Sequence, residues 1–169
     1  MSPLATDNYS EYHDAEFLQA VGLERHAKHL KAFWPRGGPC WDALAKTQYG
    51  CILVEAKSHV PEMYGSGCGA SPKTRQQIEL ALAATKDWLG VDANANWMGR
   101  LYQSANRYAF LYFLRQIAEV PAFLANIYFV GDPRTPTSRV GWQAALRQVN
   151  SELGLRNPIP FTASVFLSV

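Results

Sequence analysis

The chain has 169 residues, 48% of them hydrophobic and 18% charged, which is enough apolar material for the core of one compact domain and too little charge for a disordered tail. Its formal net charge of +2 is too small to indicate a polyanionic partner. The three cysteines, Cys40, Cys51 and Cys68, are widely spaced and form no C-x-x-C pair, which argues against a disulfide framework or a zinc site and indicates a reducing compartment.

The first thirteen residues are polar, and we expect them to be loosely ordered. They have neither the basic start nor the apolar stretch of a signal peptide. No apolar run approaches the roughly 20 residues that a membrane-spanning helix needs. The sequence therefore predicts a single cytoplasmic domain over residues 1–169, without a membrane partner.

In chain order, residues 14–33 have helical character, with Asp14 as a plausible N-cap and Gly22 as a break. A turn rich in proline and glycine follows. Two short strands are then predicted at about 40–46 and 51–58, and the intervening "TQYG" is short enough to make a hairpin.

The second half of the chain alternates helices with strands. Ser71 and Gly90 are suited to cap a helix between them, and an aromatic-rich helix is expected at about 97–118. The almost unbroken apolar run 121–132 predicts an interior strand covered on both faces. A helix over 138–154 and a strand over 159–169 complete the order α, β, β, α, α, β, α, β. This order predicts an α/β fold, a mixed sheet flanked by helices.

The strand "CILVEAKS" carries the most informative pattern. Because side chains alternate along a strand, Ile52, Val54 and Ala56 share one face, which we expect to pack against a helix. The other face begins apolar with Cys51 and Leu53 and ends with Glu55, Lys57 and His59. Charged groups on a partly buried face are costly to desolvate, so they need partners or a function.

Asp42, on the preceding strand, supplies a second carboxylate. If the hairpin turns near "TQYG", Asp42 and Glu55 come from adjacent strands at the same end of the sheet. Two neighbouring carboxylates repel, and a divalent cation relieves that repulsion. Hard oxygen ligands with room for water and phosphate suit Mg²⁺. Lys57 could then orient the attacking water or stabilise charge on a phosphate.

These residues resemble the motif of the PD-(D/E)XK nuclease superfamily, with Pro39 and Asp42 followed by Glu55-x-Lys57. The resemblance covers about residues 14–130 and includes the element order, although Cys40 and Trp41 separate Pro39 from the acid. It implies a restriction-endonuclease-like fold and a metal-dependent nuclease that uses Mg²⁺ or Mn²⁺. Asp42 and Glu55 would be metal ligands, and Lys57 the catalytic lysine.

The resemblance suggests four further site residues. The superfamily often supplies one more acid from the first helix, for which Glu24 is the best-placed candidate, although a solvated glutamate is the commoner outcome. Gln103 and Arg107 share a helix face and are similar in kind to polar residues used near the metal or phosphate; the alternative is helix capping or an ion pair. His59 is either an extra base or phosphate contact, or a polar residue at a strand end.

The sequence thus predicts a nuclease that acts on nucleic acid, DNA rather than RNA. A catalytically silent binding module on the same fold, or an α/β protein that binds only a protein partner, is the alternative. Glu55 and Lys57 could also form a solvated ion pair at a sheet edge, with Asp42 a turn acid. The small size of the chain is the only feature that suggests a homodimer or a partner subunit.

Overall fold

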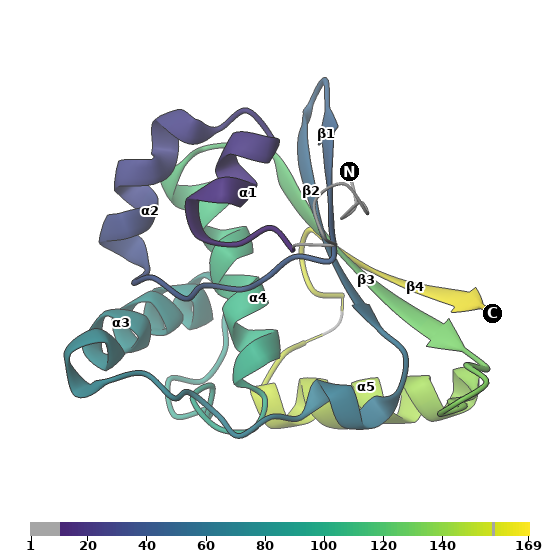
Figure 1. Ribbon diagram of the computed structural model, residues 1–169. Helices are drawn as coiled ribbons and strands as arrows, with labels where there is room; N and C mark the ends of the chain where they lie inside the picture. Colours follow the sequence, from purple (N-terminus) through teal and green to yellow (C-terminus); the bar gives the residue numbers. More distant parts are fainter. Residues whose placement is uncertain (1–10, 157) are drawn as a thin grey trace.

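A computed structural model of the chain describes residues 11–156 and 158–169. It is a mixed α/β protein built on an open four-stranded sheet (Figure 1). The sheet order is β1-β2-β3-β4, where β1 (Ala43–Thr47) and β2 (Gly50–Lys57) form the antiparallel hairpin. β3 (Ala122–Val130) pairs parallel with β2, and β4 (Thr162–Ser168) pairs parallel with β3. The hairpin and all four predicted strands are confirmed.

The helices also follow the predicted order. They are α1 (Asp14–Ala20), α2 (Ala27–Phe33), α3 (Pro72–Leu89), α4 (Tyr102–Tyr112) and α5 (Arg139–Leu153). Gly22, with a φ of 74°, breaks the first helical segment as expected, and a short 3-10 turn (Glu24–His26) leads into α2. A second 3-10 turn (Val60–Met63) follows β2, and a π-helical turn (Phe113–Ile117) follows α4.

Two local predictions were wrong. Asp14 does not cap α1, because it is the first residue of that helix and its carboxylate instead accepts hydrogen bonds from the N–H groups of Gly37 and Gly38. The helix predicted from residue 97 begins at Tyr102. Trp97 is instead buried in the preceding turn, where its indole N–H donates to the carbonyl of Leu153.

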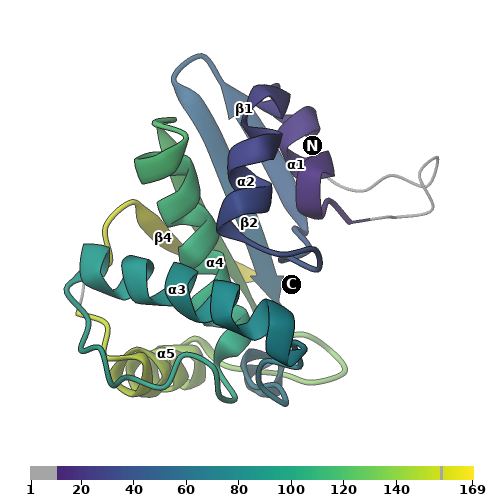
Figure 2. The same cartoon turned by 90° about the vertical axis from the view of Figure 1, so that its left-hand side faces the viewer.

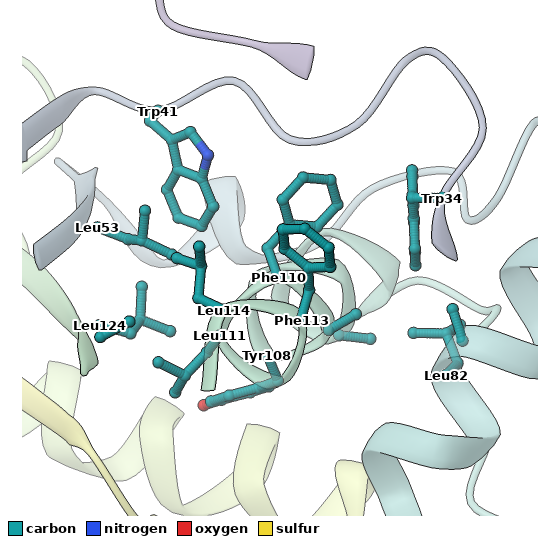
Figure 3. Close-up of a cluster of buried hydrophobic side chains, with 14 of the residues drawn as sticks. Trp34, Trp41, Leu53, Leu82, Tyr108, Phe110, Leu111, Phe113, Leu114 and Leu124 are labelled. Atoms are coloured by element: carbon teal, nitrogen blue, oxygen red, sulfur yellow. The ribbon is translucent and has the colours of Figure 1, made fainter. Parts of the chain in front are cut away.

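The helices lie on one face of the sheet. Both parallel crossovers, β2 to β3 and β3 to β4, step in the same direction across the sheet, and right-handed crossovers in one direction place their helices on the same side. Figure 2, viewed from the helical side, shows α1 to α4 in front of the strands. Figure 3 shows α4 surrounded by the core, with Leu53 and Leu124 of the sheet on one side and Leu82 of α3 on the other.

This arrangement overturns two expectations about the sheet. The face of β2 that packs against the helices carries Cys51 and Leu53, which are buried, and not Ile52, Val54 and Ala56. β3 is an interior strand, but only one of its faces is covered by the described helices. We call the opposite side of the sheet the outer face; it consists of the outward-facing side chains of β2, β3 and β4 (Ile52, Val54, Ala56, Phe123, Ala125, Ile127, Phe129, Ala163, Val165 and Leu167).

Within the described residues, no helix combines the length and the apolar character that crossing a membrane requires.

Candidate active site

Glu55 is a charged residue in a buried position. It continues the inward alternation of Cys51 and Leu53 along β2 and is only 6% exposed, between the sheet and α4. A carboxylate can be held ionised in such a place only if cations or hydrogen bonds replace its water. The solvated edge pair considered from the sequence is therefore wrong, because β2 is an interior strand and Glu55 is buried.

Two cations, Lys57 and Arg107, supply that compensation. The Lys57 Nζ lies 2.5 Å from Glu55 Oε1, and the Arg107 Nε lies 2.7 Å from Glu55 Oε2. Lys57 is two residues further along the same face of β2, whereas Arg107 reaches Glu55 from α4. The predicted proximity of Glu55 and Lys57 is confirmed, and Arg107 joins them from the helix face on which the sequence placed it.

Each of the three nitrogens of the Arg107 guanidinium group donates a hydrogen bond. Besides Glu55, it donates to the Asn106 side-chain oxygen at 2.9 Å and to the Cys40 carbonyl at 3.0 Å. Its guanidinium carbon also lies 5.3 Å from the centre of the Trp41 ring. The planar, five-donor shape of arginine suits such a bridging position. Arg107 thus ties α4 both to β2 and to the segment that leads into β1.

Asp42 lies immediately before β1, beside Glu55. Since Ala43 pairs with Val54 in an antiparallel ladder, Asp42 falls opposite Glu55, and its Oδ2 accepts a hydrogen bond from the Ala56 N–H at 2.7 Å. Burial raises the pKa of Asp42 above its ordinary value, and the charge of Glu55 adds to this, while the Ala56 N–H and Lys57 oppose it. The raised pKa is what two carboxylates in one partly buried place are expected to show.

These side chains line one open cleft of about 490 Å³. Asp42, Glu55 and Lys57 form its sheet wall, and Gln103 and Arg107 line it from α4. The segment Gly65 to Gly67 and the exposed Arg100 complete the other side. Five of the predicted site residues therefore share one cavity, and the cleft combines carboxylates with cations at the polar end of the β2 inward face.

The cleft could hold a divalent ion only in an open arrangement. Among residues 11–156 and 158–169, no cluster of three or more His, Cys, Asp or Glu side chains is placed to hold a metal. Mg²⁺, however, is commonly bound by one or two carboxylates, with water and substrate phosphate as the remaining ligands. Asp42 and Glu55 fit that pattern, but both Glu55 oxygens already contact cations. A metal ion at Glu55 would therefore compete with Lys57 and Arg107 for the same two oxygens.

Two predicted residues lie outside the cleft. His59 occupies the N-cap position of the 3-10 turn after β2, and its side chain pairs with Glu62. Burial alone would raise the pKa of Glu62, but the hydrogen bonds from Ser58 and the nearby His59 bring it below its ordinary value. Glu24 is exposed in the 3-10 turn before α2 and is not among the residues that line the cleft. The third acid that lines it is Glu11, which we did not predict because it lies in the polar N-terminal segment.

A polar row across the sheet was also missed. Glu55 pairs with Asn126 of β3, which pairs with Ser164 of β4. Asn126 and Ser164 line a second cavity of about 180 Å³, and Asn126 also lines a narrow space of about 30 Å³ whose wall includes Glu55 and Arg107. Polar groups thus continue from the cleft towards β4. The sequence feature that could have revealed this row is Asn126, the one amide side chain in the otherwise apolar and aromatic run "AFLANIYFV".

Comparisons with protein-family models, with curated proteins and with solved structures gave no match for this chain.

Proposed function

We propose that the cleft is the active site of a divalent-metal-dependent nuclease of the PD-(D/E)XK kind that hydrolyses phosphodiester bonds, with DNA as the expected substrate. One observation carries the proposal: Asp42, immediately before β1, and Glu55, on the adjacent antiparallel β2, line the same cavity as Lys57. The restriction-endonuclease-like fold is part of the same proposal. It is supported by the hairpin followed by helices and a parallel third strand. The preference for DNA depends on the sequence resemblance alone.

In this proposal, Asp42 and Glu55 would hold Mg²⁺ or Mn²⁺, which supplies Lewis-acid stabilisation and a water of lowered pKa. Arg107 fixes the Glu55 carboxylate by its bonds to Asn106 and Cys40. Lys57, once released from Glu55, would lie beside the scissile phosphate and stabilise the charge that develops on it. Gln103 lines the same cleft and would contact the phosphate backbone.

The direct test is cleavage of plasmid, linear duplex, single-stranded DNA and RNA by the purified chain with Mg²⁺ or Mn²⁺. Removing a positioned catalytic cation typically lowers a rate by about 100-fold or more, so Lys57→Met should do so. Lys73→Met removes an exposed lysine outside the cleft and should leave cleavage unchanged. Cleavage that survives Lys57→Met at the wild-type rate would refute the assignment of the site.

A second candidate is a catalytically silent nucleic-acid-binding protein with the same cleft. The observation that favours it is the pairing of both Glu55 oxygens with Lys57 and Arg107, because these two cations already compensate the Glu55 charge and a metal ion would compete with them for its oxygens. Such a protein would bind nucleic acid with an affinity that falls steeply with salt. Its affinity would not change on adding Mg²⁺, and no substrate would be cleaved.

A further inference from the structure

The outer face is uniformly apolar over β2, β3 and β4, whereas the outward side of the adjacent β1 ends in the polar Thr47. Its ten side chains are all alanine, valine, isoleucine, leucine or phenylalanine, and none carries a charge or a hydrogen-bonding group. Phe123 is 48% exposed, Val165 44% and Leu167 48%. Inward side chains of β2 and β3, such as Leu53, Leu124 and Tyr128, are buried under the helices. A sheet that faced water on this side would be expected to alternate apolar with polar residues.

The apolar area exposed on the outer face is comparable with the apolar area that one partner buries in a protein interface. If a phenylalanine side chain offers about 200 Å² and a valine or leucine about 100 Å², Phe123, Val165 and Leu167 together expose about 190 Å². The seven other side chains, of which six are half-buried and Ala163 is exposed, bring the total to about 400 Å². A standard interface buries about 800 Å² per partner, of which about 60% is apolar. The outer face therefore supplies most of the apolar area that a stable interface needs.

A second copy of the chain suits this face better than the alternatives. The ten residues before Glu11, "MSPLATDNYS", include few large apolar side chains, too few to cover the ten apolar positions of the outer face. The ten side chains carry no charge, although the Arg115 guanidinium carbon lies 5.6 Å from the centre of the Phe123 ring, so the surface offers little for a charged partner to complement. It is, however, self-complementary under two-fold symmetry, since two sheets stack face to face about 10 Å apart with their apolar side chains interdigitated.

We propose that the protein is a homodimer in which the outer faces of two sheets pack against each other. The cleft lies on the helical side of each sheet, between the inward face of β2 and α4, so both clefts stay open to solvent in this dimer. The proposal does not depend on nuclease activity, and its test needs no substrate.

The test is the mass of the protein in solution, by light scattering after gel filtration and by sedimentation equilibrium, from about 1 to 100 µM protein. The wild type should have twice the 18.8 kDa of one chain. The double variant Val165→Lys/Leu167→Lys places two charges on each outer face and should raise the dimer dissociation constant at least about 100-fold, because the charges would be buried without partners. Val140→Lys, at a 72% exposed valine of α5, is the matched control and should remain dimeric.

A second variant guards against loss of the fold. Val165→Thr/Leu167→Thr keeps one β-branched residue and introduces another on β4, so circular dichroism should show an unchanged fold while dimerisation weakens. A wild type that is monomeric at 100 µM would overturn the proposal. So would a folded double variant that stays fully dimeric, or a Val140→Lys variant that dissociates as readily as the outer-face variants.

Discussion

The pairing of Arg107 with Glu55 predicts a large loss of stability in Arg107→Met. Methionine keeps much of the apolar stem but leaves Glu55, which is 6% exposed, with Lys57 as its single cation. Removing one partner of a buried ion pair costs about 3–5 kcal/mol. Because Lys57 remains, the lower end applies, and we expect the free energy of unfolding to fall by about 3 kcal/mol. The lost hydrogen bonds to Cys40 and Asn106 contribute to the same figure.

Urea unfolding measures this loss directly. With a slope of about 2 kcal/mol per molar urea, the midpoint should fall by about 1.5 M. Arg75→Met makes the same substitution in an exposed pair, in which Arg75 contacts Glu79 at 2.9 Å, and should cost at most about 0.5 kcal/mol. The double variant Arg107→Met/Glu55→Gln should lose less than the sum of the single variants, because no uncompensated charge remains. If Arg107→Met lowers the free energy of unfolding no more than Arg75→Met does, the pairing of Arg107 with Glu55 does not stabilise the fold as described.

Two further predictions concern single positions, one in the cleft and one at the start of β2. Asp42→Asn keeps an oxygen that accepts from the Ala56 N–H but removes the carboxyl group. Burial and the charge of Glu55 raise the native pKa of that carboxyl above its ordinary value of 3.8, so ionising Asp42 destabilises the folded wild type as the pH rises above 3.8. The variant should therefore be more stable than the wild type at pH 7 and lose this advantage near pH 4; equal urea midpoints at pH 7 would contradict the pKa direction. Gly50→Ala should cost at least about 3 kcal/mol, measured by thermal unfolding, because φ is 152° and an added Cβ would lie 1.7 Å from the Pro121 carbonyl oxygen. Gly37→Ala, where φ is 85° but nothing lies within 4 Å, should cost only about 1 kcal/mol; equal losses would show that the contact with Pro121 is unimportant.

The geometry around β2 could be predicted from the sequence because it follows from short-range rules. Alternation along the strand places Glu55 and Lys57 on one face, and the four-residue turn brings Asp42 opposite Glu55. The helical spacing of Gln103 and Arg107 likewise directs both to the cleft. Each of these predictions needed only the local period of one element or one hairpin.

What could not be predicted depends on how distant elements meet. An apolar run such as 121–132 indicates that both strand faces avoid water, but it does not tell whether helices of the same chain or another surface cover them. The Glu55–Asn126–Ser164 row depends on the register between strands that are far apart in the sequence. Glu24 was chosen because the first helical segment was expected to present the third acid, whereas the acid that lines the cleft, Glu11, lies in the segment before that helix.

The most direct test of the proposed metal site is calorimetric titration of Mg²⁺ and Mn²⁺ into the purified chain. We predict one site whose affinity falls at least about tenfold in Asp42→Asn, while Asp87→Asn, at an exposed position of α3, binds as the wild type does. Arg107→Met provides a second comparison where it is folded, since it leaves one Glu55 oxygen free. A wild type that binds neither ion, or one whose binding is unchanged by Asp42→Asn, would contradict the central claim that Asp42 and Glu55 together hold a divalent ion.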